Sequence, residues 1–206
     1  MLLTADILQR AANCTRGTAL TWAQPLSDAC ALYAINTPTR LAAFLAQVGH
    51  ESAGLTVTIE NLHYRAEGLL KTWPKRFTPE LAKELAQRPA EIAEHVYGGR
   101  MGNSHPGDGY RFRGRGLLQV TGRANYEVVN EMLGKVPNAP DLLALPEALA
   151  EPKWAAYSAA AFWDYCGLNR NADAGDFRGI TRRINGGELG MADRIKRYER
   201  ARQVLA

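Results

Sequence analysis

Two glutamates, nine positions apart, are the residues of this chain whose types and spacing could do chemistry. They are Glu51 and Glu60, in the stretch GHESAGLTVTIEN. A pair of carboxyl groups can cleave a glycosidic bond when one is protonated and acts as an acid while the other is ionised and acts as a base. An inverting reaction needs about 6.5–9.5 Å between them, so that a water molecule fits beside the sugar. The alternative is that both are solvated charges or ion-pair partners of nearby arginines, which is common for glutamates.

The helix expected before Glu51 places this side chain at the border between core and solvent. Thr37 and Pro38 are typical of an N-cap and a first helical position, and Gly54 suits the end of a helix that runs to about Ser52. The apolar stripe of this helix consists of Leu41, Phe44, Leu45 and Val48. At roughly 100° per residue, Glu51 lies about 70° from the centre of the stripe. A carboxyl group there loses solvation and favours the protonated form, as a general acid must.

The second glutamate follows an extended segment. Residues 56–59, TVTI, are rich in β-branched side chains, which favour an extended backbone. Asn61 and His63 are polar neighbours of Glu60, so we expect a wetter environment in which this carboxyl group ionises and serves as a base.

Capping residues divide most of the remaining chain into short helices. We expect helices over 78–98, interrupted at Pro89, and over 123–132, 153–166 and 192–204. The exception is Tyr110 to Thr121, YRFRGRGLLQVT, where aromatic residues alternate with arginine. A small β-hairpin or an extended loop is predicted there, and the hairpin is the version adopted for the fold. The aromatic side chains between Trp154 and Tyr165 are interpreted as core packing rather than as a sugar platform.

Composition narrows the class of protein. A chain of 206 residues with 46% apolar residues can form one domain with a substantial core, and its net charge of +4 weakly favours an acidic partner. Three cysteines without C-x-x-C spacing indicate neither a disulfide framework nor a cysteine zinc site.

The sequence after His50 lacks the second histidine of an H-E-x-x-H motif, so we expect no metal and no cofactor. The opening MLLTADILQRAAN has no basic region before its apolar residues, so no export signal is expected.

Several motifs in one order give the chain a recognisable pattern. They are HESAG, E-N-L-x-Y, YRFRGRGLLQVTGRxNY, INGG and ADRI, which together span roughly residues 41–198. This pattern resembles glycoside hydrolase family 19, the plant-type chitinases and the related phage and prophage endolysins. The segment AEGLLKTWPKRF is more similar to the endolysin branch.

The resemblance implies a role for individual positions. It makes Glu51 the general acid and Glu60 the general base, and it makes Thr121 the hydroxyl residue that holds the attacking water. A hydroxyl group can donate one hydrogen bond and accept another, which suits that task. The resemblance assigns substrate binding in the cleft to His50, Gln119, Asn125, Asn185 and Arg194. Within this set it makes Gln119 and Asn125 partners of the sugar's N-acetyl and hydroxyl groups, and it links Asn185 and Arg194 to the network around the acid.

The chain also departs from the plant enzymes of the family. Only eight residues separate its two glutamates, where the plant enzymes carry a longer segment stapled by disulfides. The chain is also short after INGG, so it stays open whether Glu188 corresponds to the third cleft carboxylate of the family, and Glu188 is left outside the catalytic set. Lost loops imply a more open groove, which suits a cross-linked polymer.

These observations predict a mainly α, lysozyme-like, two-lobed helical domain over residues 1–206, with a small β-hairpin beside the groove and no separate wall-binding module. The predicted function is that of an endolysin that hydrolyses β-1,4 bonds of bacterial peptidoglycan with inversion. We expect a monomer, synthesised in the host cytoplasm and admitted to the periplasm and cell wall by a separate holin.

Three alternatives stay open at this point. A chitinase would use the same residues on chitin oligosaccharides, and a lytic transglycosylase would need the acid alone. A non-catalytic module that binds the wall or a nucleic acid is the third. RFRGRG could contact single strands, but the aromatic residues are few and the chain is only mildly basic, so no nucleic-acid partner is expected.

Overall fold

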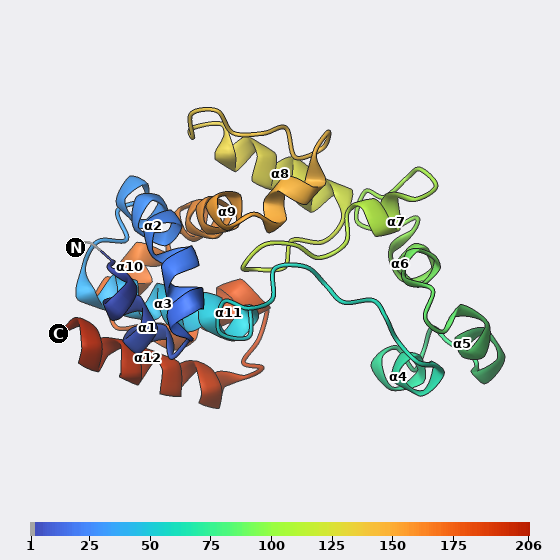
Figure 1. Cartoon of the computed structure of the whole chain (residues 1–206), viewed down its shortest axis with the longest axis horizontal. Coiled ribbons are helices and arrows are strands. Elements are labelled where there is room, and N and C mark those ends of the chain that lie inside the picture. The colour runs from blue at the N-terminus through green and yellow to red at the C-terminus, as the bar shows by residue number, and fades with distance from the viewer. Residues whose placement is uncertain (1–2) are drawn as a thin grey trace.

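The structure is a computed structural model that describes residues 3–206, and its regular elements are helical (Figure 1). One group of helices is formed by α1 (Ala5–Ala12), α2 (Arg16–Leu32), α3 (Pro38–Glu51), α8 (Arg123–Leu133), α9 (Pro152–Tyr165), α10 (Leu168–Asp173), α11 (Phe177–Asn185) and α12 (Met191–Leu205). A second group is formed by α4 (Ala66–Thr72), α5 (Pro79–Leu85), α6 (Pro89–Tyr97) and α7 (Asp108–Arg111). A short 3₁₀ helix, η1 (Pro146–Ala150), precedes α9. The prediction of a mainly helical protein is confirmed.

Two separate hydrophobic clusters correspond to the two groups. The larger one is built from α1, α2, α3 and α8 to α12, and the smaller one from α4, α5 and α6 with the segments beside them. Figure 1 shows α4, α5, α6 and α7 gathered on one side of the molecule, while the segments around residues 53–65 and 112–122 run between the two groups. Those two segments carry Glu60 and the predicted hairpin, so both lie where the groups meet.

The central helix α3 forms as its sequence predicts. The Thr37 side chain accepts a hydrogen bond from the Arg40 amide at 3.2 Å, and Pro38 occupies the first turn. The apolar stripe is buried in the larger cluster, where Phe44 meets Trp163 edge-to-face at 5.5 Å between ring centroids. Helix α3 also packs along α12, which brings the C-terminal part of the chain against the end of α3 that carries Glu51.

The other predicted helices are also present, with boundaries that differ by one or two residues. The segment from Pro79 is divided into α5 and α6 at Pro89, as expected, because proline cannot donate the helical hydrogen bond. Among the described residues, no helix is long and apolar enough to cross a membrane.

The predicted β-hairpin over Tyr110 to Thr121 is wrong. Tyr110 and Arg111 belong to the short helix α7, and only isolated bridges connect Arg115 with Ile59 and with Val120. The backbone turns back at once, because Gly116 has φ +79° and Gln119 has φ +51°, so the two sides of the turn are too short to form strands. We call residues 112–122 the glycine loop.

The interpretation of the α9 aromatic residues holds only in part. Trp154 and Trp163 are buried, but Tyr165 is 71% exposed and Phe162 is half-buried beside a hollow in the surface. The sequence could not separate these positions, because α9 is covered on one side by α2 and on another by α8.

Candidate active site

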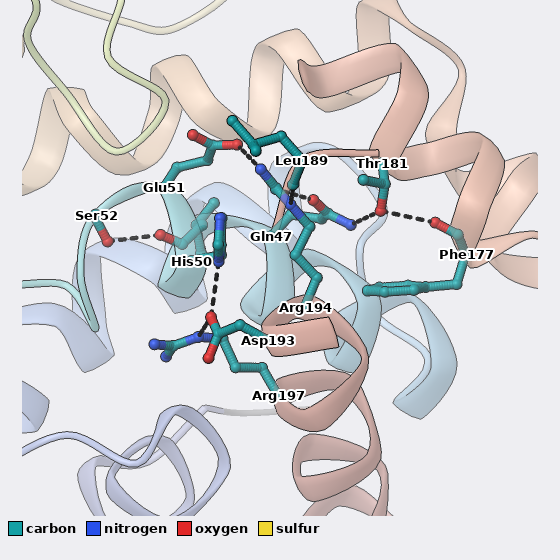
Figure 2. A network of polar contacts seen from close by, with 11 residues as sticks. Gln47, His50, Glu51, Ser52, Phe177, Thr181, Leu189, Asp193, Arg194 and Arg197 are labelled. Carbon is teal, nitrogen blue, oxygen red and sulfur yellow. Dashed lines mark hydrogen bonds and ion pairs between the residues drawn. The ribbon is translucent and has the colours of Figure 1, made fainter. Parts of the chain in front are cut away.

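Glu51 ends α3 and faces an arginine from the far end of the chain (Figure 2). Its Oε1 atom accepts a short hydrogen bond from Nη2 of Arg194, which lies on α12. The side chain of Arg194 is 1% exposed and that of Glu51 is 23% exposed. The predicted position at the border of the core is therefore confirmed. However, the immediate neighbour of Glu51 is a buried cation, so desolvation against apolar side chains, the predicted reason for a protonated Glu51, is not what the structure shows.

Further polar contacts fix the orientation of Arg194. Its Nη1 donates to Oε1 of Gln47 at 2.5 Å, and its Nε donates to the carbonyl oxygen of Leu189 at 3.2 Å. Gln47 in turn donates to the Thr181 hydroxyl at 2.8 Å, and that hydroxyl donates to the Phe177 carbonyl at 3.1 Å. Figure 2 shows this chain of contacts running from Glu51 into the interior. A buried charge is tolerated only when its polar atoms find partners, so this network holds both the guanidinium group and Glu51 in place.

His50 lies in a second contact network beside the first. Its Nδ1 is 2.7 Å from Oδ2 of Asp193, which also accepts a hydrogen bond from Nε of Arg197 at 2.6 Å. Burial opposes ionisation of Asp193, but the hydrogen bonds from Arg197 and His50 outweigh it and hold the pKa of this carboxyl group below its ordinary value. Gly190 packs against the His50 ring so closely that a Cβ atom would lie 2.3 Å from it.

Glu60 is held differently, by neutral donors. Its Oε1 accepts a hydrogen bond from the Tyr97 hydroxyl at 2.5 Å, and its Oε2 accepts one from the Gly114 amide at 3.1 Å. Burial, followed by the hydrogen bond to Glu60, raises the pKa of Tyr97, so this phenol stays a donor at all ordinary pH values. Glu60 also lines a surface hollow of about 250 Å³ together with the polar residues Asn61, His63 and Arg113 and with apolar residues that include Ile59 and Leu62, so the expected polar setting holds only in part.

Gly114 brings Glu60 together with two other predicted residues. A Cβ atom at Gly114 would lie 2.9 Å from Oε1 of Gln119, 3.1 Å from Cβ of Glu60 and 3.2 Å from Oγ1 of Thr121. The Thr121 hydroxyl donates to the Gln119 carbonyl at 3.0 Å, and the Asn125 amide donates to the Thr121 carbonyl at 2.7 Å. The glycine loop therefore collects a carboxylate, a hydroxyl group and two amides at one place.

Asn185 is the remaining residue that the family resemblance assigned to the site, and it is less closely connected with the other site residues. Asn185 is the last residue of α11, and its neighbour Ile184 lines the same surface hollow as Gln119, Thr121 and Asn125. Glu188, which the sequence analysis left out of the catalytic set, accepts hydrogen bonds from Arg178 and Arg182 on α11.

Sequence reasoning missed three residues that support the two carboxylates. Tyr97 and Gly114 hold Glu60, and Gln47 holds the arginine that pairs with Glu51. Gln47 could have been noticed, because it is a polar residue next to the apolar stripe of α3. No local pattern marks Tyr97, because its partner lies 37 residues away.

The arrangement provides two carboxyl groups with different surroundings, a hydroxyl group beside one of them, and amides that can bind a polar polymer. Among the described residues, no group of three or more histidine, cysteine, aspartate or glutamate side chains is placed to hold a metal ion. These features suit acid–base hydrolysis of a carbohydrate.

Two solved structures that share this fold are chitinases. A bacterial family 19 chitinase, whose crystal structure and enzymatic properties were described as different from those of plant enzymes, aligns with a TM-score of 0.66 and 23% identity over 100% of this chain and 96% of that one. Chitinase C from Streptomyces griseus HUT6037 aligns with a TM-score of 0.66 and 19% identity over 99% of this chain and 92% of that one. The fold is thus that of the chitinase-like glycoside hydrolases.

A curated relative identifies the family. A glycosyl hydrolase family 19 domain-containing protein from Haemophilus influenzae is 38% identical over 161 residues, which cover 76% of this chain and 76% of that protein. No family model matches the chain. From the relative and the fold together, the chain belongs to glycoside hydrolase family 19, and it is a glycoside hydrolase.

Proposed function

We propose that the chain is an endolysin that hydrolyses β-1,4 glycosidic bonds of bacterial peptidoglycan, with inversion at the anomeric carbon. The observation that carries the proposal is the contrast between the two carboxyl groups. Glu51 pairs with the buried cation of Arg194, and Glu60 lies against the glycine loop beside Thr121. Arg194 can stabilise the anion that Glu51 becomes after it gives up its proton, and Thr121 lies where it can orient a water molecule toward Glu60, so the two carboxyl groups can act as acid and base in one step.

In the proposed reaction, Glu51 donates its proton to the glycosidic oxygen as the bond from that oxygen to the anomeric carbon breaks. Glu60 accepts a proton from a water molecule, whose oxygen forms the new bond to the anomeric carbon from the opposite face. Thr121 orients this water. After the transfer, Glu51 is an anion, and the guanidinium group of Arg194 stabilises it because the pair is largely shielded from solvent.

Peptidoglycan is favoured over chitin by charge. The chain carries a net charge of +4, peptidoglycan carries many carboxylates, and chitin is uncharged. We further propose that the enzyme is a monomer made in the host cytoplasm, and that a separate holin admits it to the cell wall. A chitinase is the second candidate, because both solved proteins named above are chitinases.

The test is to digest purified peptidoglycan and chitin oligomers in parallel and to identify the products by mass spectrometry. Reducing ends from peptidoglycan support the proposal, and anhydro ends would indicate a lytic transglycosylase instead. Cleavage of chitin alone would make the protein a chitinase. Proton NMR of the first product should show the α-anomer, and a β-anomer would exclude inversion.

The roles of the two glutamates are tested separately on the substrate that is cleaved. Glu51→Gln and Glu60→Gln should each lower kcat by about 10²–10⁴-fold, the usual contribution of a general acid or base. Unchanged turnover in either variant would remove that residue from its role. Glu80→Gln is the matched control, because Glu80 is exposed on α5, outside the candidate site, and should tolerate the change.

A further inference from the structure

Two adjoining hollows lie on the surface beside α8 and α9, and neither Glu51 nor Glu60 lines them. Their volumes are about 330 Å³ and 310 Å³, and they share Val128, Met132 and Tyr165. Helices α8 and α9 pack against each other, and Figure 1 shows them side by side. We call this feature the α8–α9 groove.

One end of the α8–α9 groove reaches the glycine loop. The first hollow is lined by Gln119, Thr121 and Asn125, which the candidate active site already contains, and otherwise mainly by apolar side chains. A polymer bound at the loop would therefore place one of its substituents at the entrance of the groove.

The other end of the groove is charged. The second hollow is lined by Glu131, Lys135 and Asp164, all of which are exposed. From Asn125 to Leu133, the end of α8, the chain advances eight residues, about 12 Å at the rise of an α-helix, and Lys135 follows two residues later. An extended peptide of roughly four residues covers this length.

The apolar side chains in the groove are unusually open to solvent. Tyr165 is 71% exposed and Val128 is 42% exposed, and both line the two hollows. Packing of the core does not account for them, and exposed apolar side chains gathered in a hollow are typical of a binding surface.

We propose that the α8–α9 groove binds the peptide stem of peptidoglycan, and this inference rests on the proposed function. The stem is a short peptide joined to one sugar of each pair through a lactyl group. It starts with the methyl groups of the lactyl and alanyl units and continues with an acidic residue and a charged third residue. Apolar side chains near the glycine loop match the methyl groups, Lys135 matches the carboxylates, and Glu131 and Asp164 match an amino group. Chitin has no stem, so the groove distinguishes the two polymers.

The experiment compares two forms of one glycan. Peptidoglycan strands that carry their stems and strands freed of stems by an amidase are digested by the wild-type enzyme, by Tyr165→Ala and by Lys135→Glu. The measured quantity is the ratio of kcat/KM for stem-bearing strands to kcat/KM for stem-free strands. We expect each variant to lower this ratio about tenfold, mainly through KM, because contacts with the stem are lost. The effect of Lys135→Glu should shrink at high salt, whereas that of Tyr165→Ala should not.

Matched controls separate this proposal from general damage. Leu20→Ala removes an exposed apolar side chain on α2, and Lys83→Glu reverses an exposed charge on α5, so both should keep the wild-type ratio. Two results would overturn the stem site while leaving peptidoglycan hydrolysis intact. One is a ratio near one for the wild-type enzyme. The other is an equal loss of kcat/KM on stem-bearing and stem-free strands in Tyr165→Ala and Lys135→Glu. Cleavage of chitin alone by the wild-type enzyme would instead overturn the proposed function, and the stem site with it.

Discussion

The two carboxylates of the candidate site are supported by opposite kinds of structure. Glu51 ends a buried helix, and its partner Arg194 is fixed by Gln47 and by the backbone of Leu189. Glu60 lies on an extended segment and is held by the Tyr97 hydroxyl and the Gly114 amide. The first residue thus depends on a buried charge and on helix packing, and the second depends on neutral donors and on close backbone approach. Changes to the residues that support Glu51 should therefore lower the stability of the fold, whereas changes to the residues that support Glu60 should mainly lower activity.

The largest effect should come from Arg194→Met. The substitution removes the buried cation and leaves Glu51 and Gln47 without their donor, and breaking a buried ion pair costs about 3–5 kcal/mol. Urea denaturation should show the corresponding fall in the free energy of unfolding. Arg183→Met, at an exposed position on α11, should stay within about 0.5 kcal/mol of the wild type. If Arg194→Met changed the free energy of unfolding equally little, the packing around α3 and Glu51 would not depend on the ion pair.

The second-largest effect, a fall in kcat, is expected from Gly114→Ala. The added methyl group would meet Gln119, Glu60 and Thr121 at 2.9–3.2 Å, so these groups must shift apart. A displacement of about 1 Å at a catalytic group can cost roughly 100-fold in rate. We expect kcat to fall by about that factor while the melting temperature changes little. Gly187→Ala, where the methyl group meets no atom within 4 Å, is the control. Full activity of Gly114→Ala would show that the glycine loop tolerates rearrangement.

A smaller loss should follow Tyr97→Phe. The ring is kept and only the hydrogen bond to Glu60 is lost, and a hydrogen bond to a charged group contributes about 1.5–3 kcal/mol. The Gly114 amide still donates to the other carboxylate oxygen of Glu60. We therefore expect kcat to fall by about tenfold, which corresponds to the lower limit of that free-energy range. Steady-state kinetics on the cleaved substrate measure it, with Tyr64→Phe as the control. A change in KM alone would place Tyr97 in substrate binding instead.

The smallest effect is the acid dependence contributed by Asp193. Because its pKa is lower in the folded protein than its ordinary value of 3.8, its ion pairs stabilise the fold above that value. This stability is lost as the pH falls through the lowered pKa. The pair is partly exposed, so the contribution should be below about 1 kcal/mol. The stability advantage of the wild type over Asp193→Asn should be largest above the ordinary pKa of 3.8 and should shrink as the pH falls below it. A difference in unfolding free energy that does not shrink as the pH is lowered below 3.8 would exclude this assignment.

Local chemistry in the sequence determined the helices. Threonine and proline at 37–38 and 78–79 satisfy the free amides of a first turn and preset its backbone, whatever the rest of the chain does. The position of Glu51 at the edge of the core also followed from helical periodicity. The family motifs supplied the assignment of Glu60, Thr121, Gln119 and Asn125, and the glycine loop brings these four residues together.

Only the tertiary structure decided what surrounds those residues. Arg194 reaches Glu51 across 143 positions, and Gly114 reaches Glu60 across 54, so no local pattern records either contact. The predicted hairpin failed for a related reason, because alternation of arginine and aromatic residues does not show that the loop turns back at Gly116. The exposure of Tyr165 likewise depends on how α8 packs beside α9. Helix signals act within a few residues, whereas partners of a buried charge or a surface groove are set by packing between distant segments.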